Sequence, residues 1–472
     1  MSILIWILPD IYSFVTALNT FGQGTAGGKS RLSTLQCKCL SFLMTGLILT
    51  GACSFAALSR YSWASYTARG IGKMFHSFNL PLDKLYLISV KRILSLFGVK
   101  GYLVCDDTDR PRAKGTTKLF GVFKSKDKKT GGYGIFQNIV FLFVVTDKGS
   151  FPVAFRFYRP DPAIKAWKKK DEELRKAKVP RRKRPKAPKE SPEYPNRNTI
   201  FVALLEEFKT LFPEFEVTSI CADAAFLSKH SRKAVATVYP DVQFISQLKQ
   251  NQIVSSKKSH EQPLIDYFKY MKPLKKVIQV RGGIEKVLYY CSARLYVKAH
   301  GKKAHIIALR EEGEAEYRYL AASELTWHSE SIIKAYSMRW LIEVFIEDWK
   351  CYDGWGKAGS QYGKEGARRG VLLSLLVDHF LLSHPLQLKR VNAGKPLLTA
   401  GSLVRYLQFQ WILDAVTQIL DSPNPKEYVE QLRQRAVQIA DFRESKKHMS
   451  GAPWEELGPT KALLTRYGKQ AA

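Results

Sequence analysis

The chain has 472 residues, more than one hydrophobic core usually serves, so its length predicts two to three domains. Lys and Arg total 74 against 42 Asp and Glu, which gives a formal net charge of +32 at pH 7. Like charge in this excess destabilises a compact chain unless a polyanion offsets it, and DNA or RNA is the commonest such partner. A small-metabolite enzyme is therefore a poor first interpretation.

Cysteine and histidine spacing excludes several classes of protein. The seven cysteines are an odd, scattered set without paired metal-ligand spacing: Cys37, Cys39, Cys53, Cys105, Cys221, Cys291 and Cys351. This pattern predicts free thiols in a reducing cytoplasm, not a disulfide framework or a zinc ribbon. The nine histidines show no HExxH motif, so the sequence does not indicate a zinc hydrolase.

One apolar stretch raises the question of a membrane. Residues 40–58 carry no charge over 19 positions, close to the roughly 20 that cross a bilayer. Interspersed Ser, Thr and Gly dilute its hydrophobicity, so we expect a buried helix and no membrane attachment. The apolar residues 1–8 lack a preceding basic region and end at Pro9-Asp10, unlike a secretory signal.

In chain order, residues 1–95 have helical spacing, for example over 80–97, and predict a helical N-terminal domain that could bind DNA ends. From residue 101 the pattern changes to short Val-, Ile- and Phe-rich runs separated by turn residues. We expect strands at 102–105, 118–123, 138–146 and 153–158.

A basic insertion, residues 160–198, follows these strands. Residues 165–189 contain 13 basic and 3 acidic side chains, a local net charge of +10. The segment fits either a solvated helix with a flexible linker or an arm that binds phosphates, and the charge leaves both open.

The next region completes an α/β pattern. Helical spacing at 199–212 and 226–237 alternates with strand patterns at 216–221 and 242–248, so residues 100–249 predict a sheet with helices on its faces. Residues 250–325 are β-patterned and predict a β-rich insertion subdomain. Helices then follow at 329–350, 367–382 and 403–420; we assign residues 326–385 to the catalytic domain and 386–472 to a helical C-terminal region that could mediate multimerisation.

Four side chains of the helix expected from Ser329 to Lys350 share one face. At about 100° per residue, Tyr336, Arg339, Glu343 and Lys350 fall within roughly 60° of one another. A core helix would present aliphatic side chains there, whereas a hydroxyl, two cations and a carboxylate are typical of a face that lines a site. A solvated surface with an i,i+4 pair between Arg339 and Glu343 is the alternative.

Acidic residues also end two predicted strands. Asp107 and Asp223 each follow a buried strand, at the edge where α/β sheets place ligands. Carboxylates are the ligands that hard cations such as Mg²⁺ prefer. Together with Glu343 they could hold two metal ions about 3.5–4 Å apart, the arrangement used to cleave phosphodiesters.

The spacing Tyr-x2-Arg-x3-Glu-x6-Lys, matched in full by Tyr336, Arg339, Glu343 and Lys350, resembles the YREK signature of DDE transposases of insertion-sequence family 4. Asp107-Thr108 and the Asp-Ala-Ala-Phe at 223–226 resemble the two earlier acidic motifs of that family. The resemblance covers roughly residues 100–385.

Asp106 directly precedes Asp107, and neighbouring strand residues face opposite sides, so only one can reach the metals. We prefer Asp107 because it abuts Thr108, as in the family motif.

This resemblance implies an RNase H-like catalytic domain interrupted by a β-rich insertion, with 119 residues between Asp223 and Glu343. It implies Asp107, Asp223 and Glu343 as catalytic and metal-binding residues, two Mg²⁺ per site with Mn²⁺ as a substitute, and Tyr336, Arg339 and Lys350 as DNA contacts. The implied partners are double-stranded DNA, as element ends and target, and a second copy of the chain, in the cytoplasm and at the nucleoid of a bacterial cell. A flipped base would stack on Trp327, Tyr289 or Tyr290.

The resulting prediction is a transposase that cleaves DNA at element ends and joins them to a target. An RNase H-like nuclease or resolvase without strand transfer is the first alternative. A basic, non-catalytic DNA-binding protein is the second.

Overall fold

The computed structural model describes residues 7–21, 32–51, 54–62, 66–127, 130–256, 260–280, 283–352, 354 and 361–439. The chain divides into two compact units, Met1–Gln418 and Ile419–Ala472. The first unit contains the sheet and the helices that cover it.

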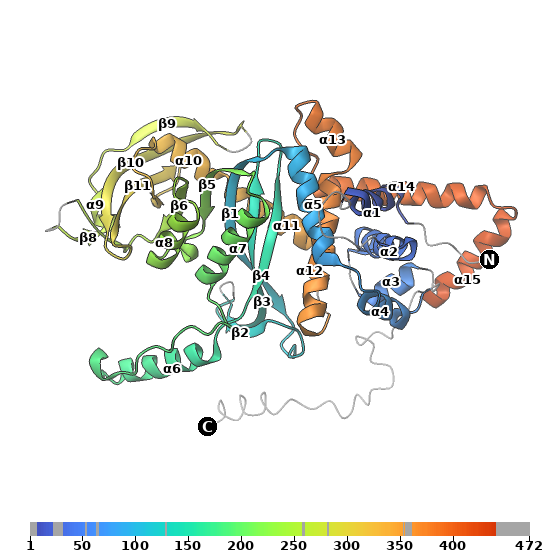
Figure 1. Cartoon of the computed structure of the whole chain (residues 1–472), viewed down its shortest axis with the longest axis horizontal. Helices are drawn as coiled ribbons and strands as arrows, with labels where there is room; N and C mark the ends of the chain where they lie inside the picture. Colours follow the sequence, from blue (N-terminus) through green and yellow to red (C-terminus); the bar gives the residue numbers. More distant parts are fainter. Residues whose placement is uncertain are drawn as a thin grey trace, which may run out of the picture. The chain divides into compact units, whose positions relative to one another are not determined.

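The described strands of the first unit form one mixed sheet of twelve (Figure 1). Their bounds are β1 (Lys100–Arg112), β2 (Val122–Lys126), β3 (Tyr133–Val145), β4 (Ser150–Tyr158), β5 (Glu216–Ala222), β6 (Gln243–Leu248), β7 (Ile253–Ser255), β8 (Gln262–Pro263), β9 (Leu274–Gln279), β10 (Glu285–Val297), β11 (Lys302–Glu311) and β12 (Arg318–Ala322). They run in the order β2-β3-β1-β5-β6-β12-β11-β10-β7-β8, with β4 on β3 and β9 on β10.

The described α-helices are α1 (Pro9–Phe21), α2 (Thr34–Thr50), α3 (Phe55–Tyr61), α4 (Ala68–Ser77), α5 (Leu82–Phe97), α6 (Pro162–Lys176), α7 (Arg197–Leu211), α8 (Lys229–Val238), α9 (Leu264–Phe268), α10 (Ser329–Ser337), α11 (Trp340–Cys351), α12 (Gly363–Leu382), α13 (Pro385–Asn392), α14 (Ala400–Leu420) and α15 (Pro425–Ile439). Helix α15 lies in the second unit.

Strand β1 occupies the middle of the predicted catalytic region. It pairs antiparallel with β3 and parallel with β5, and β5 pairs parallel with β6. The last seven residues of β3 are apolar and buried, as expected of a strand covered on both faces. The mixed α/β character predicted for this region is confirmed.

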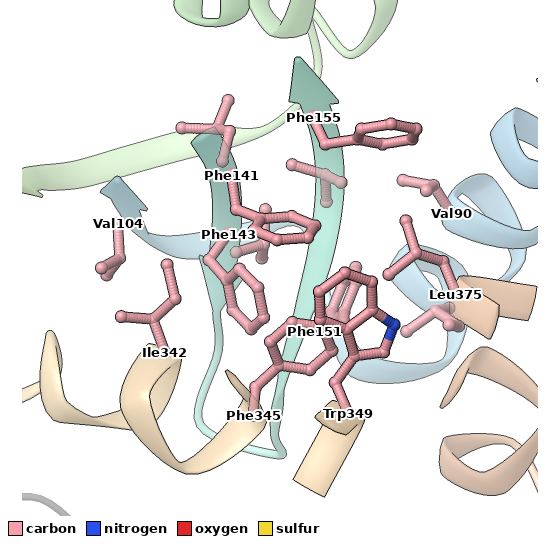
Figure 2. Packing of buried hydrophobic residues seen from close by; sticks show 14 of the residues in the cluster. Val90, Val104, Phe141, Phe143, Phe151, Phe155, Ile342, Phe345, Trp349 and Leu375 are labelled. Atoms are coloured by element: carbon pink, nitrogen blue, oxygen red, sulfur yellow. The ribbon is translucent and has the colours of Figure 1, made fainter. Parts of the chain in front are cut away.

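Helix α11 is held on the sheet by aromatic packing. Figure 2 shows Phe345 and Trp349 of α11 pointing toward Phe141 and Phe143 of β3. The Trp349 ring centroid lies 5.0 Å from that of Phe141, and Phe345 lies 4.5 Å from Phe143. The Trp349 indole N–H donates to the Ser374 hydroxyl at 2.9 Å, which ties α11 to α12 as well. This packing fixes the helix that carries Glu343.

The N-terminal helices share one hydrophobic core with the sheet. Helix α2 begins with a capping box between Ser33 and Gln36 and ends at Gly51 in the left-handed conformation. Residues 40–48 within it are buried, as predicted for this apolar stretch, but the single helix expected over 40–58 ends at Thr50, and a separate helix, α3, begins at Phe55. Among the described residues, no single helix is long and apolar enough to cross a membrane, although two bent helix pairs pass on length and composition.

Three predicted elements need correction. The helix expected over 329–350 is interrupted after Ser337, because Met338 and Arg339 donate their amides to residues three positions back, and the turn tightens before α11. The strand expected at 118–123 begins at Val122, and Leu119 makes only an isolated bridge. The β-patterned residues 250–325 include the short helix α9, and their strands extend the main sheet beyond β6, with an additional core of their own.

A buried histidine joins α5, α12 and β4. The His379 ring is fully buried, with Nε2 3.0 Å from the Pro152 carbonyl oxygen and Nδ1 2.6 Å from the Ser89 hydroxyl. A neutral ring satisfies both contacts, donating at Nε2 and accepting at Nδ1. Burial lowers the pKa of His379 to about 3.

The neutral state of His379 predicts acid sensitivity. The unfolded chain binds a proton at this histidine below about pH 6.5 and the folded chain does not, so this stability is lost as pH falls from about 6.5 toward 3. We expect His379→Gln to remove about 2 kcal/mol of the loss in unfolding free energy between pH 7.5 and pH 5. Urea unfolding at both pH values measures it. His230→Gln, at an exposed position, is the control and should keep the wild-type pH dependence.

Candidate active site

Asp106, on β1, lies near Asp223, the first residue after the parallel strand β5. The register between β1 and β5 ends with Cys105 beside Ala222, so the next residue on each chain is an aspartate. Side chains alternate between the faces of a sheet, and paired residues share a face. The Asp223 carboxylate is close enough to Asp106 to raise its pKa. Two carboxylates from segments more than 100 residues apart therefore meet on one face.

Arg339 connects this pair of acids to the helical glutamate. Its Nη1 donates to Asp106 Oδ2 at 2.7 Å, and its Nη2 donates to Glu343 Oε1. The side chains of Asp106 and Arg339 are 13% and 16% exposed, so this ion pair is largely withdrawn from water, whereas Glu343 is 36% exposed. One guanidinium thus lies between carboxylates from β1 and α11.

The acids outnumber the cation that faces them. Burial raises the pKa of Asp106, Arg339 opposes that rise, and Asp223 adds to it. Negative charge is therefore costly here in spite of the guanidinium, and additional positive charge would stabilise the ionised form.

Asp107, which we preferred as the first acid, lies on the other face of β1. Its Oδ2 accepts from Arg197 Nε at 3.0 Å and from the side-chain amide of Asn138. Arg197 also stacks 4.1 Å above the Tyr158 ring. Strand alternation turns Asp107 toward α7, while Asp106 faces Arg339 and, through it, Glu343 of α11.

Tyr336 and Lys350 flank the acids. Burial raises the pKa of Tyr336, and its hydroxyl has no hydrogen-bond partner in the described part of the chain. The Tyr336 ring centroid is 5.7 Å from the Arg339 guanidinium carbon. Lys350 Nζ donates to Thr108 Oγ1 at 2.6 Å and to the Asp109 carbonyl at 3.2 Å, so it lies farther along the same strand. All four residues of the predicted helical face thus contact the site or the strand beside it.

Within the described ranges, no three His, Cys, Asp or Glu side chains lie close enough to share a metal ion. The expected set of Asp107, Asp223 and Glu343 is therefore not assembled here, and neither is the set with Asp106 in place of Asp107. Asp106, Asp223 and Glu343 do share a face, and the Arg339 guanidinium lies between Asp106 and Glu343. Oxygen ligands of this kind fit a hard divalent cation chemically.

The three aromatic residues considered for base stacking are already engaged. Tyr290 is buried, and Trp327 packs against the main core. The Tyr289 ring lies 4.8 Å from the Arg310 guanidinium carbon and 5.4 Å from Lys275 Nζ. The structure brings none of them into the hydrogen-bond network of Arg339.

Sequence reasoning missed two parts of this arrangement. It weighed Asp106 but not the pairing of β1 with β5 that puts it beside Asp223, and alternation alone does not say which face of β1 meets α11. It did not single out Arg197, the partner of Asp107. The sequence around Arg197 contains no motif that would identify this arginine as a partner of Asp107.

Comparisons with known proteins are sparse. No protein-family model matches the chain, and no curated protein matches it. Among solved structures, a piggyBac transposase synaptic complex with hairpin DNA is similar at a TM-score of 0.41 and 12% identity, over 95% of this chain and 85% of that chain. The NurA nuclease from Sulfolobus solfataricus is similar at a TM-score of 0.20 and 9% identity, over 50% of this chain and 72% of that chain.

The Arg339 ion pairs predict a specific loss of stability. Arg339→Gln leaves the Asp106 carboxylate buried without its cation, which should lower the unfolding free energy by about 3–5 kcal/mol. The double variant Asp106→Asn with Arg339→Gln should lose clearly less than the sum of the two single variants. Urea unfolding curves measure both effects.

Arg318 provides the matched control for this prediction. It also pairs with two carboxylates, Glu311 and Glu314, but is 46% exposed. Arg318→Gln should cost only about 0–1 kcal/mol. Equal losses for the Arg318 and Arg339 variants would contradict the buried ion pair.

Proposed function

We propose that the chain is a DDE-type DNA transposase that cleaves DNA at the ends of an element and joins the freed 3′-ends to target DNA. Asp106, Asp223 and Glu343 are the proposed catalytic acids, so Asp106 replaces Asp107 in the set expected from sequence. The observation that carries the proposal is the Arg339 guanidinium bound between Asp106 and Glu343, with Asp223 beside Asp106.

The sheet supports an RNase H-like interpretation of this region. The first acid lies on the first strand, β1, and the second follows β5, the fifth strand in sequence when the short β2 is counted. The glutamate lies on a late helix that packs on the same sheet. This is the order of acids that the family resemblance implies.

We propose that Asp106, Asp223 and Glu343 would hold Mg²⁺, with Mn²⁺ as a substitute. Bound divalent cations would supply Lewis acidity at the scissile phosphate. The pKa of Asp106 is raised by burial and by Asp223, so positive charge at this position favours its ionised form.

The remaining signature residues would bind the DNA backbone. When DNA binds, Arg339 would give up its hydrogen bonds to the carboxylates and donate two parallel hydrogen bonds to a phosphate, a geometry suited to its planar guanidinium. Lys350, anchored at Thr108, would add a point charge farther along β1. The buried Tyr336 hydroxyl would donate to a phosphate oxygen.

The proposed reaction has two steps. In hydrolysis, water forms the new bond to phosphorus and the strand leaves as a 3′-hydroxyl. In joining, that hydroxyl attacks a target phosphodiester and releases another 3′-hydroxyl.

The basic insertion is the proposed contact to flanking duplex DNA. Helix α6 has no buried residue and projects from the sheet (Figure 1). The chain folds back along it, where the Trp167 indole donates to the Pro185 carbonyl at 2.8 Å and Arg184 pairs with Asp171 at 3.0 Å. Most cations of residues 165–189 thus remain on an exposed arm.

Since two element ends need two active sites, a homodimer on double-stranded DNA is the proposed assembly.

The cleavage and joining reaction tests the proposal. The substrate is a plasmid carrying the gene for this chain with its natural flanking DNA, incubated with protein and Mg²⁺ beside a target plasmid. Asp106→Asn and Glu343→Gln should each lower cleavage by about 1,000-fold or more, since each removes a charged group from the reacting phosphate. Asp107→Asn should stay within about 10-fold of wild type, because its contacts lie on the other face.

End-labelled strands separate the outcomes of this experiment. Joined plasmids with new 3′ junctions support the transposase. Cleavage that never gives joined product supports the nuclease alternative, and full activity in the Glu343→Gln protein refutes catalysis at these acids.

The arm predicts a salt dependence of duplex binding. Replacing lysines 168–170 by alanine should make the slope of log K against log salt less steep by about 2 to 3, since each lost phosphate contact contributes about 0.9. Fluorescence anisotropy with a 30-base-pair duplex in chelator, from 50 to 200 mM salt, measures the slope. The control removes the same charge from exposed positions elsewhere, Lys233, Lys249 and Lys389. Equal slopes for the two triple variants would place the duplex outside the arm.

A further inference from the structure

The face of β1 that carries Asp106 continues as a cationic path. The β1–β3 register is unbroken from Tyr102 to Arg112, so every second residue stays on one face. That face presents Asp106, Thr108 with Lys350 bonded to it, and then Arg110 and Arg112. The Gln137 side chain lies between the two arginines, pairing with Arg110 in the register and accepting from Arg112 at 2.5 Å.

A polar cavity of about 540 Å³ opens at the far end of this path. Its polar and aromatic lining is Arg110, Arg112, Thr116, Thr117, Lys118 and Tyr362. No carboxylate is among the described residues that line it. The cavity therefore combines three cationic side chains with three hydroxyls, which suits an anion.

Tyr362 lies at the rim of the cavity because the chain just after it is joined to the opposite wall. Leu119 and Gly363 form a parallel bridge, which holds the start of α12 against the loop that follows β1. The Tyr362 side chain is 69% exposed and makes no capping hydrogen bond. An open aromatic ring beside cations is the usual platform for a nucleobase.

The two arginines carry positive charge in a place that disfavours it. Burial lowers the pKa of Arg112 to about 10, and burial together with Arg112 lowers the pKa of Arg110 to about 9. An anion in the cavity would relieve this repulsion.

We propose that this cavity binds the phosphodiester backbone of the DNA strand that leaves the acids along β1, with one of its bases stacked on Tyr362. The inference rests on the proposed function for its choice of DNA. At about 3.3 Å per residue, Arg110 and Arg112 lie about 13 and 20 Å along the strand from Asp106. For stacked nucleotides at 3.4 Å each, this corresponds to about four to six nucleotides from the reacting phosphate.

Binding of a fluorescein-labelled 12-nucleotide oligothymidylate tests the site in chelator, where no cleavage occurs. All proteins carry Glu343→Gln, so binding is measured apart from catalysis. Tyr362→Ala should weaken binding roughly 5- to 100-fold through loss of stacking, and Tyr362→Phe should restore it. Lys118→Ala should make the salt slope less steep by about 0.7, as for one phosphate of a single strand. Both positions are exposed, so the fold should tolerate the changes.

Matched controls are available in the β-rich region. Tyr270 is 86% exposed, and Lys272 is exposed two residues away. Tyr270→Ala and Lys272→Ala should leave both the affinity and the salt slope unchanged.

The outcomes distinguish this site from the proposed reaction. Weaker binding in the Tyr362→Ala and Lys118→Ala proteins alone supports the cavity, even if no cleavage is ever found. Failure of the parent protein to bind the oligonucleotide, or equal effects of the control variants, overturns the inference while leaving cleavage and joining to their own test.

Discussion

The site depends on one buried guanidinium. Arg339 and Asp106 are 233 positions apart in sequence, yet their ion pair and the second bond to Glu343 join the central strand to the helix packed upon it. Carboxylates brought this close in a largely dry environment repel one another, so they can share a face only with a cation between them. A site that holds acids together through an arginine also contains a guanidinium, whose planar donors suit a phosphate as well as a carboxylate in the reaction proposed above.

The core of the molecule determines where that guanidinium lies. Helix α11 has a buried side, on which Phe345 and Trp349 pack against Phe141 and Phe143 of β3 and Ile342 lies near Val104 (Figure 2). Its less buried side carries Glu343. The indole bond to Ser374 adds a polar constraint on the depth and rotation of the helix. Packing of this density leaves few alternative rotations, so the apolar residues of α11 position the acid.

Much of the fold follows from local pattern, whereas the site follows from pairing. Apolar periodicity was sufficient for α5, β3 and α12, since each buries its own stripe or run. Alternation shows that Asp106 and Asp107 face opposite sides but not which side meets Glu343. The Arg339 bonds to Asp106 and Glu343 decide that, and the bond to Asp106 is a long-range contact. The helix is interrupted at Met338 and Arg339 without a helix-breaking Pro or Gly, so helical spacing alone could not predict the interruption.

The two faces of β1 have different partners, and this separation explains why neighbouring aspartates need not share a role. Asp106 meets Arg339, which lies between α10 and α11, while Asp107 meets Arg197, the first residue of α7, near the end of the basic insertion. The ion pair of Asp107 therefore ties the end of the arm segment to the same strand that carries the acid. A change at Asp107 would act on the attachment of the arm, whereas a change at Asp106 would act on the group of carboxylates, although their backbones are adjacent.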